Sequence, residues 1–250
     1  MDLKGKDLLE FTANKGADKA NSSYKKMIIL GFLAGLYISI GYALYLKAIS
    51  SSDSEWAGLI GSFLFPIGLL LIVVAGGDLF TGNILDVAVS YLLKKVPLSL
   101  LVRNWVVVFL SNALGAVFLA YTYGEVLGFN DALMQTGTLQ YAIDGKLNWS
   151  PWEMIVSGML CNILVTLGIW LSNSSKSNVG KMFLLWVPIA AFVYLGFQHS
   201  VANLYLLTSG LFAGVTTIGP VLSNLLFVVI GNILGGAVVV AGLYAAAYGD

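Results

Sequence analysis

The chain has 250 residues, of which 58% are hydrophobic and only 10% are charged, and its mean hydropathy is +0.86. A soluble domain usually has about a quarter of its residues charged, so this composition excludes an ordinary water-soluble protein and predicts an integral membrane protein. The formal net charge is zero, which gives no reason to expect nucleic acid or an acidic partner. The single cysteine, Cys161, excludes an internal disulfide and is predicted to be a buried packing residue.

Residues 1–26 are polar, and their apolar positions predict a short amphipathic helix that lies on the membrane or at the mouth of a channel. These apolar positions are Leu8, Leu9, Phe11 and Ala13. Residues 27–250 are predicted to form one all-α transmembrane domain, because roughly 20 apolar residues cross a bilayer as a helix. The six expected spans are 27–46, 56–93 with an interruption at 78–83, 105–124, 152–171, 182–208 with an interruption at 196–200, and 220–247.

The distribution of basic residues predicts the orientation of the chain. With six spans both termini lie on one side of the membrane, together with the loops 94–104 and 172–181. This side holds 11 of the 13 basic residues. The positive-inside rule therefore predicts cytoplasmic termini in a multi-pass protein of the cell inner (plasma) membrane.

An internal repeat relates the two halves of the domain, about 27–125 and 150–248. The segment 111–116 (SNALGA) matches 231–236 (GNILGG), and each segment follows an interrupted span. Each half has three spans, an odd number, so the halves are expected to face opposite sides of the bilayer. In such inverted repeats, paired interrupted helices mark a substrate path near the membrane midplane.

The only histidine, His199, lies in the second interruption, inside a run from 182 to 249 without Asp, Glu, Lys or Arg. Desolvation disfavours a charged imidazole, whereas an incoming anion favours it. The two could share a proton, so that a weak acid crosses the apolar part of the path as a neutral species. Thr81 in the first interruption is predicted to meet His199 and to hold it by a hydrogen bond. Asp78 is predicted to accept hydrogen bonds from the amides of its own loop or to cap the half-helix that follows.

The segments 77–83 (GDLFTGN) and 196–203 (GFQHSVAN), with the two Asn-x-x-Gly segments, resemble the motifs of the formate/nitrite transporter family. The resemblance covers essentially the whole chain. It implies an aquaporin-like protomer with broken second and fifth helices, assembled as a homopentamer with one path per protomer. It also implies passage of small monovalent anions and protons, with formate first and nitrite, hydrosulfide, acetate or lactate as alternatives.

The resemblance also assigns roles to individual residues. It implies that His199 is the central proton-exchanging group and that Thr81 is its partner in the loop. It also implies that Asn162 and Asn203 are polar pore positions and that Lys146 draws anions into the outer vestibule. The implied apolar constrictions are Phe65, Leu69, Leu79, Phe80, Val165 and Phe192. Without the resemblance, Phe65, Leu69, Val165 and Phe192 are more typical of plain packing, and Lys146 is equally typical of a solvated lysine in the polar loop 128–150. Gln198 departs from the family, because many formate-type members have Glu there.

The sequence argues against two other classes of protein, an intramembrane enzyme and a water or glycerol pore. An intramembrane enzyme needs a nucleophile with its base, or a set of metal ligands. The sequence has no second histidine, and Cys161 has no basic neighbour, so no enzyme, cofactor or metal site is predicted. A water or glycerol pore would also use two half-helices, but the duplicated Asn-Pro-Ala signature and the pore arginine of aquaporins are absent.

Overall fold

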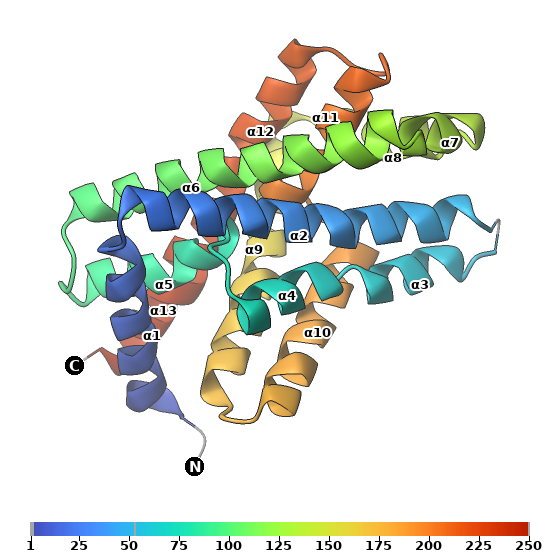
Figure 1. Ribbon diagram of the computed structural model, residues 1–250. Coiled ribbons are helices and arrows are strands. Elements are labelled where there is room, and N and C mark those ends of the chain that lie inside the picture. The colour runs from blue at the N-terminus through green and yellow to red at the C-terminus, as the bar shows by residue number, and fades with distance from the viewer. Residues whose placement is uncertain (1–2, 53, 250) are drawn as a thin grey trace.

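The computed structural model describes residues 3–52 and 54–249, and this part of the chain is helical without any strand. The predicted all-α class is confirmed (Figure 1). The first half contains α1 (Gly5–Ala20), α2 (Tyr24–Ser50), α3 (Ala57–Leu64), α4 (Ile67–Ala75), α5 (Phe80–Leu92), α6 (Leu98–Leu119) and the π-helical segment η1 (Ala120–Val126). The second half contains α7 (Phe129–Gln135), α8 (Thr138–Leu147), α9 (Pro151–Ser174), α10 (Asn178–Tyr194), α11 (Ser200–Phe212), α12 (Ile218–Ile233), the π-helical segment η2 (Leu234–Gly242) and α13 (Leu243–Tyr248).

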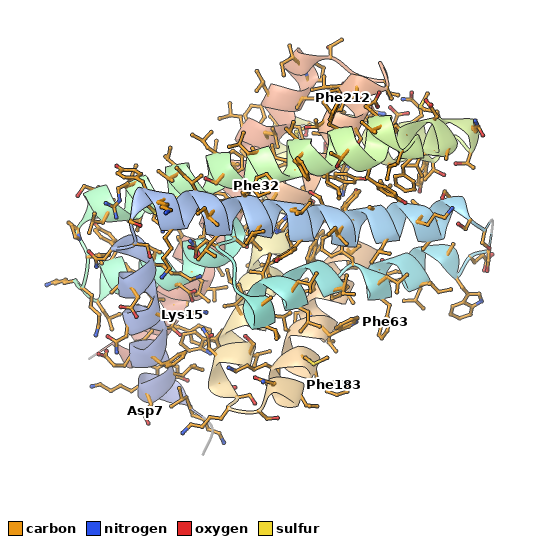
Figure 2. The ribbon with its side chains drawn as sticks, viewed as in Figure 1. Asp7, Lys15, Phe32, Phe63, Phe183 and Phe212 are labelled. Carbon is orange, nitrogen blue, oxygen red and sulfur yellow. The ribbon has the colours of Figure 1, made fainter. Side chains whose placement is uncertain are left out.

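Five helical stretches in the described chain are long and apolar enough to cross a membrane. They are Tyr24–Ser50, Ala57–Ala75, Leu98–Val126, Pro151–Ser174 and Ile218–Tyr248, and they correspond to five of the six expected spans. The remaining expected span is divided between α10 and α11, which are shorter, so the count of six stays a prediction. Large apolar side chains such as Phe63 and Phe183 point outward and are 60% and 72% exposed, as on a surface that faces lipid (Figure 2).

Both expected interruptions are present, but the first was placed too far along the chain. The helix ends at Ala75 and resumes at Phe80, so Thr81 lies in the first turn of α5 and not in the loop. Gly76 makes the turn, with a φ of +97° that favours glycine. Gly82 is helical, and a Cβ there would lie 2.7 Å from Ile169, so it is a close-packing glycine.

Two further features were not expected from the sequence. The second span is also interrupted at Pro66, between α3 and α4, because proline lacks the N–H that continues a helix. The polar region 128–150, expected to be a loop, contains the helices α7 and α8, and Lys146 lies in the last turn of α8. Cys161 is buried in α9, as predicted.

The predicted amphipathic helix near the N-terminus is α1, which buries Leu8, Leu9 and Ala13, whereas Phe11 is 44% exposed. It packs mainly on α5 and also contacts α9 and α13. Figure 1 shows α1 running at a steep angle to α2 at the end of the molecule where both chain ends lie. Arg103 on α6 holds the C-terminal end of α1 through the carbonyl oxygens of Ala20 and Ser22.

The same helix crossing occurs in each half of the chain. α2 packs closely along α6, and α9 packs closely along α12 and η2. A Cβ on Gly115 would lie 2.1 Å from the carbonyl oxygen of Phe32, and one on Gly235 would lie 2.2 Å from that of Met159. Only glycine allows these helix backbones to approach so closely, which explains the matched glycines of the sequence repeat.

Candidate functional site

His199 and Thr81 meet where the two interrupted helices resume. Thr81 Oγ1 lies 3.0 Å from His199 Nε2, and both side chains are buried. The predicted contact is therefore present in the structure. His199 is also the N-cap of α11, and its Nδ1 accepts a hydrogen bond of 3.0 Å from the backbone N–H of Ala202. Because Nδ1 is an acceptor, the neutral ring carries its proton on Nε2 and donates it to Thr81.

Aromatic rings cover one side of His199. The ring of Phe192 on α10 lies 5.6 Å from the imidazole at an angle of 17° between the planes. Phe65, between α3 and α4, packs edge-on against Phe192 at 5.6 Å and against Tyr42 at 5.9 Å. The imidazole therefore has a hydroxyl group on Nε2 and an apolar wall beside it.

Two cavities adjoin the two breaks, one at each, and share no lining residue. The first, here called the Lys146 cavity, has a volume of about 290 Å³, and its lining includes Lys146, Phe192, His199 and Asn203. The second, called the Lys19 cavity, has a volume of about 190 Å³. Its lining includes Lys15, Lys19, Leu69, Leu79, Gly82 and Asp86. Each cavity thus combines at least one lysine with apolar side chains.

Two buried asparagines support the backbone at the two breaks. Asn112 on α6 accepts a hydrogen bond from the N–H of Phe80 at 2.9 Å and donates to the carbonyl oxygen of Asp78 at 2.9 Å. Asn232 on α12 accepts from the N–H of Ser200 at 3.0 Å and donates to the carbonyl oxygen of Gln198 at 3.1 Å. A broken helix in a membrane needs such partners for its free backbone groups.

Each break also carries a polar cluster. At the first, Lys19 Nζ donates to Asn83 Oδ1 at 2.6 Å and lies 3.7 Å from Asp78 Oδ1. Asn83 Nδ2 donates to Asn104 Oδ1 at 3.0 Å, and Asn104 Nδ2 donates to the carbonyl oxygen of Lys19 at 3.1 Å. Asp78 was predicted to bind the amides of its own loop, but its side chain instead faces Asn83 and Lys19.

The second cluster surrounds Lys146, whose Nζ bonds backbone instead of side chains: it donates to the carbonyl oxygens of Gly196 at 3.0 Å and Phe197 at 3.4 Å. Asn203 Nδ2 donates to Gln198 Oε1 at 2.6 Å and to Asn224 Oδ1 at 2.9 Å. The lysine therefore satisfies two carbonyl groups of the break while its charge faces the Lys146 cavity.

The other expected site residues form two groups, those that line a cavity and those that do not. Leu69 and Leu79 line the Lys19 cavity, and Phe192 and Asn203 line the Lys146 cavity. The expected positions that are buried but line neither cavity are Phe65, Phe80, Val165 and Asn162. Phe80 packs on Phe109 at 5.0 Å, and Asn162 Nδ2 donates to the carbonyl oxygen of Asn232 at 2.7 Å.

Sequence reasoning missed three charged residues of the Lys19 cavity. The Asp86 carboxylate on α5 is buried, 3.2 Å from Lys15 Nζ and 2.9 Å from Lys19 Nζ. Lys15 and Lys19 are four residues apart on one face of α1, and Figure 2 shows Lys15 beside the helices that α1 covers. The signal in the sequence was Asp86 itself, since a carboxylate in an apolar helix needs a cationic partner.

Comparison with known proteins decides the family. The sequence model of the family described as "Formate/nitrite transporter" matches residues 6–246. The chain belongs to the formate/nitrite transporter family. It is 36% identical to the formate channel BtFdhC of Bacillus thuringiensis over 98% of this chain and 95% of that one.

Two solved structures are similar to this member of the formate/nitrite transporter family. An "FNT family ion channel" superimposes with a TM-score of 0.88 at 25% identity over 96% of this chain and 98% of the other. A "pentameric formate channel with formate bound" gives a TM-score of 0.76 at 27% identity over 91% and 98% of the two chains. The chain is therefore an integral membrane protein of a family of channels and transporters, as the resemblance of its motifs indicated.

Proposed function

We propose that the protein is a channel or proton-coupled transporter for small monovalent weak-acid anions, with formate as the first substrate. The observation that carries this proposal is a buried His199–Thr81 pair between two lysine-bearing cavities. Relatives and solved structures named as formate channels favour formate. Nitrite, hydrosulfide, acetate and lactate are the alternatives to be separated by experiment.

The assembly that goes with this function is a homopentamer of aquaporin-like protomers, each with six spans in two inverted halves. The similarity to a pentameric formate channel supports it. The termini are proposed to be cytoplasmic in the cell inner membrane, because most basic residues lie on their side. The Lys19 cavity, beside α1, then opens to the cytoplasm and the Lys146 cavity to the outside.

Selectivity follows from the order of groups along the path. A lysine at each mouth attracts anions, and the apolar side chains between the two cavities exclude hydrated ions, because a dry constriction offers no replacement for their water. Leu79 and Phe192 lie at the inner ends of the two cavities in this proposal. Only a solute that sheds its charge, or that is small and weakly hydrated, crosses between them.

His199 supports proton exchange by the way it is held. Its neutral ring already donates from Nε2 to Thr81, and its Nδ1 accepts from Ala202. A second proton on Nδ1 would break this cap, so the doubly protonated ring is costly without an anion beside it. In the proposed exchange, a proton from solvent is shared between the ring and a bound anion. The proton then leaves with the anion as the neutral acid, and the ring returns to the form in which it caps α11.

Gln198 contributes no proton to this exchange. Its Nε2 donates to the carbonyl oxygen of Lys146 at 3.0 Å, and its Oε1 accepts from Asn203. Both ends of the amide are therefore used to join α8 to the second break. The glutamine is a structural link in the proposed mechanism, and proton passage depends on His199 alone.

The proposal is tested by flux into proteoliposomes that contain the purified pentamer. Formate, nitrite, hydrosulfide, acetate and lactate are compared as anions of rising size at pH 5.5 and 7.5, with chloride as the anion of a strong acid. We expect formate flux to exceed that of the larger anions, to rise at the lower pH, and to exceed that of chloride at both. Absence of flux for every weak-acid anion, with the pentamer present, contradicts the proposal.

Substituting Thr81 by valine is expected to shift the pH dependence of formate flux and to lower its rate about tenfold, because the imidazole loses its partner on Nε2. Thr166→Val is the matched control, since Thr166 is equally buried but bonds only the carbonyl oxygens of its own helix. The pH profile of flux from 5 to 8 is compared for both variants. An unchanged profile in Thr81→Val means that the hydroxyl only fills space.

A second pH effect is expected at Lys146. Burial lowers the pKa of its ammonium group to about 8, so the charge is present below this pH and lost above it. The half-saturating formate concentration on the Lys146 side is therefore expected to rise about threefold between about pH 7 and pH 9.5. Lys146→Arg stays charged over this range and should show no such rise. The same rise in both proteins would show that another group titrates.

A further inference from the structure

The helix α1 occupies the position in the first half of the chain that α8 occupies in the second. Asn104 Nδ2 contacts the carbonyl oxygen of Lys19 and the sulfur of Met27, the latter at 3.7 Å. Asn224 Nδ2 contacts the carbonyl oxygen of Lys146 at 2.9 Å and the sulfur of Met154 at 3.7 Å. The structural repeat therefore includes α1, which the repeat read from the sequence left out.

The residues that correspond in the two halves can be read from these contacts. Asn83 and Asn104 correspond to Asn203 and Asn224, and a shift of the same length places Asp78 opposite Gln198 and Asp86 opposite Leu206. The spacing from Lys19 to Lys146 places Lys15 opposite Ala142. The halves thus share their lysine and asparagines but differ in three charged positions.

These differences give the two cavities unequal charge. The Lys19 cavity has two lysines, Lys15 and Lys19, and they face two carboxylates, those of Asp78 and Asp86. Among the described residues, those lining the Lys146 cavity include one lysine and no Asp or Glu. One mouth is close to neutral and the other keeps a full positive charge.

Asp86 is the residue that produces most of this neutrality. Its carboxylate is completely buried, whereas the side chains of Lys15 and Lys19 are 33% and 21% exposed. It contacts both lysines, so it reduces the field that each of them presents to an anion in the cavity. Ser90 Oγ, one turn further on α5, also donates to the carbonyl oxygen of Ala13 and fixes α1 over this carboxylate.

We propose that Asp86 and Lys15 set the sidedness of anion binding. They hold the Lys19 cavity near neutrality, so the transported anion binds more tightly from the Lys146 side. This inference rests on the proposed function and adds the residues that determine how the two mouths differ. It makes Asp86 and Lys15 specificity-determining residues that need no contact with the anion.

If transport is passive, thermodynamics constrains the kinetic constants measured from the two sides of the membrane. With equal pH and no voltage across the membrane, the ratio of maximal rate to half-saturating concentration is the same in both directions, because the path cannot drive net flux at equilibrium. A lower half-saturating concentration on the Lys146 side is therefore matched by a lower maximal rate from that side. Both constants are to be measured from each side, and their equal ratio verifies the assay.

The test uses vesicles with a single protein orientation, selected by an N-terminal tag, and labelled formate added to either side. In the wild type we expect a half-saturating concentration about threefold or more lower on the Lys146 side. Asp86→Asn adds positive charge to the Lys19 cavity and should lower the value on that side by a similar factor. Lys15→Gln removes positive charge and should raise it, and the double variant should return to the wild-type value.

The opposite signs separate charge from structure. Both single variants break the same ion pair, so a purely structural role predicts that they change transport in the same direction and that the double variant does not recover. An electrostatic role also predicts that all shifts shrink between 20 mM and 500 mM salt, since the Debye length falls from about 20 Å to about 4 Å. Equal half-saturating concentrations on the two sides of the wild type would overturn the inference.

Gln198→Glu is an independent test if Asp86→Asn does not assemble. It places a carboxyl group against the backbone of Lys146, and its negative charge should raise the half-saturating concentration on the Lys146 side about threefold, with no change on the other. An unchanged value there also overturns the inference. A wild-type protein that carries no weak-acid anion at all refutes the proposed function itself, whereas equal affinity at two working mouths refutes only the sidedness.

Discussion

Replacing His199 by phenylalanine is expected to lower formate flux at least about a hundredfold while the pentamer still assembles. Phenylalanine keeps a flat aromatic ring that can stack on Phe192, which lies 5.6 Å from the imidazole. It lacks both ring nitrogens, so Thr81 loses its partner and α11 loses its N-cap. Loss of an N-cap costs about 1 kcal/mol, too little to unfold a domain of this size. Flux and size-exclusion profiles of the same preparation measure the two effects.

His199→Asn separates the capping role from proton exchange. Asparagine is a good N-cap and can accept from the N–H of Ala202, but its amide does not titrate. We expect this variant to be as stable as the wild type and to lack the increase of formate flux at low pH. Wild-type flux with a wild-type pH profile in His199→Asn would mean that the imidazole serves only as a cap of α11.

The spans and the central pair were predictable because their signals are local. Long apolar runs identify membrane helices. Burying a titratable histidine inside a membrane costs free energy, so a lone histidine at a helix break indicates a functional site. Thr81 was paired with His199 correctly, although it was placed in the loop instead of the first turn of α5. The glycine pattern could not show this difference, because Gly82 serves packing against Ile169 and Gly76 serves the turn.

The repeat was found in the sequence from the segments 111–116 and 231–236, and the same register extends to the breaks in the structure. It places Gly76 opposite Gly196 and Asp78 opposite Gln198, which both precede a clustered asparagine by five residues. In the structural register Leu79 corresponds to His199 and Thr81 to Val201. The paired residues at the centre are therefore not repeat partners, and each half supplies one member.

The Lys19 cavity could not be built from the sequence because its charges come from distant segments. Lys15 and Asp86 are 71 residues apart, and nothing in a polar N-terminal tail shows that two of its lysines are covered by α5. Such pairing depends on how α1 docks, which side-chain packing decides. Phe65 and Val165 are also buried. An apolar side chain is buried both beside a transport path and in ordinary packing, so residue type alone does not distinguish these two positions.

Replacing Asn232 by leucine is expected to give the largest loss of stability. The leucine has the same number and branching of side-chain heavy atoms but leaves the N–H of Ser200 and the carbonyl oxygens of Gln198 and Gly158 without their partner. Each buried group left unpaired costs about 1–3 kcal/mol, so the total is on the order of 3 kcal/mol or more. For a domain of this size, the melting temperature of the pentamer in detergent should then fall by about 10 °C.

Asn112→Leu is the equivalent change at the other break and should have a similar effect, since Asn112 pairs with Phe80, Asp78 and Gly31. Ser111→Ala is the matched control, because the buried Ser111 hydroxyl bonds only the carbonyl oxygen of Val107 on its own helix. A fall no larger than that of Ser111→Ala would show that water reaches the break and replaces the amide. The two asparagines share no partner, so the losses in the double variant should add. A smaller combined loss would show that the two breaks unfold as one unit.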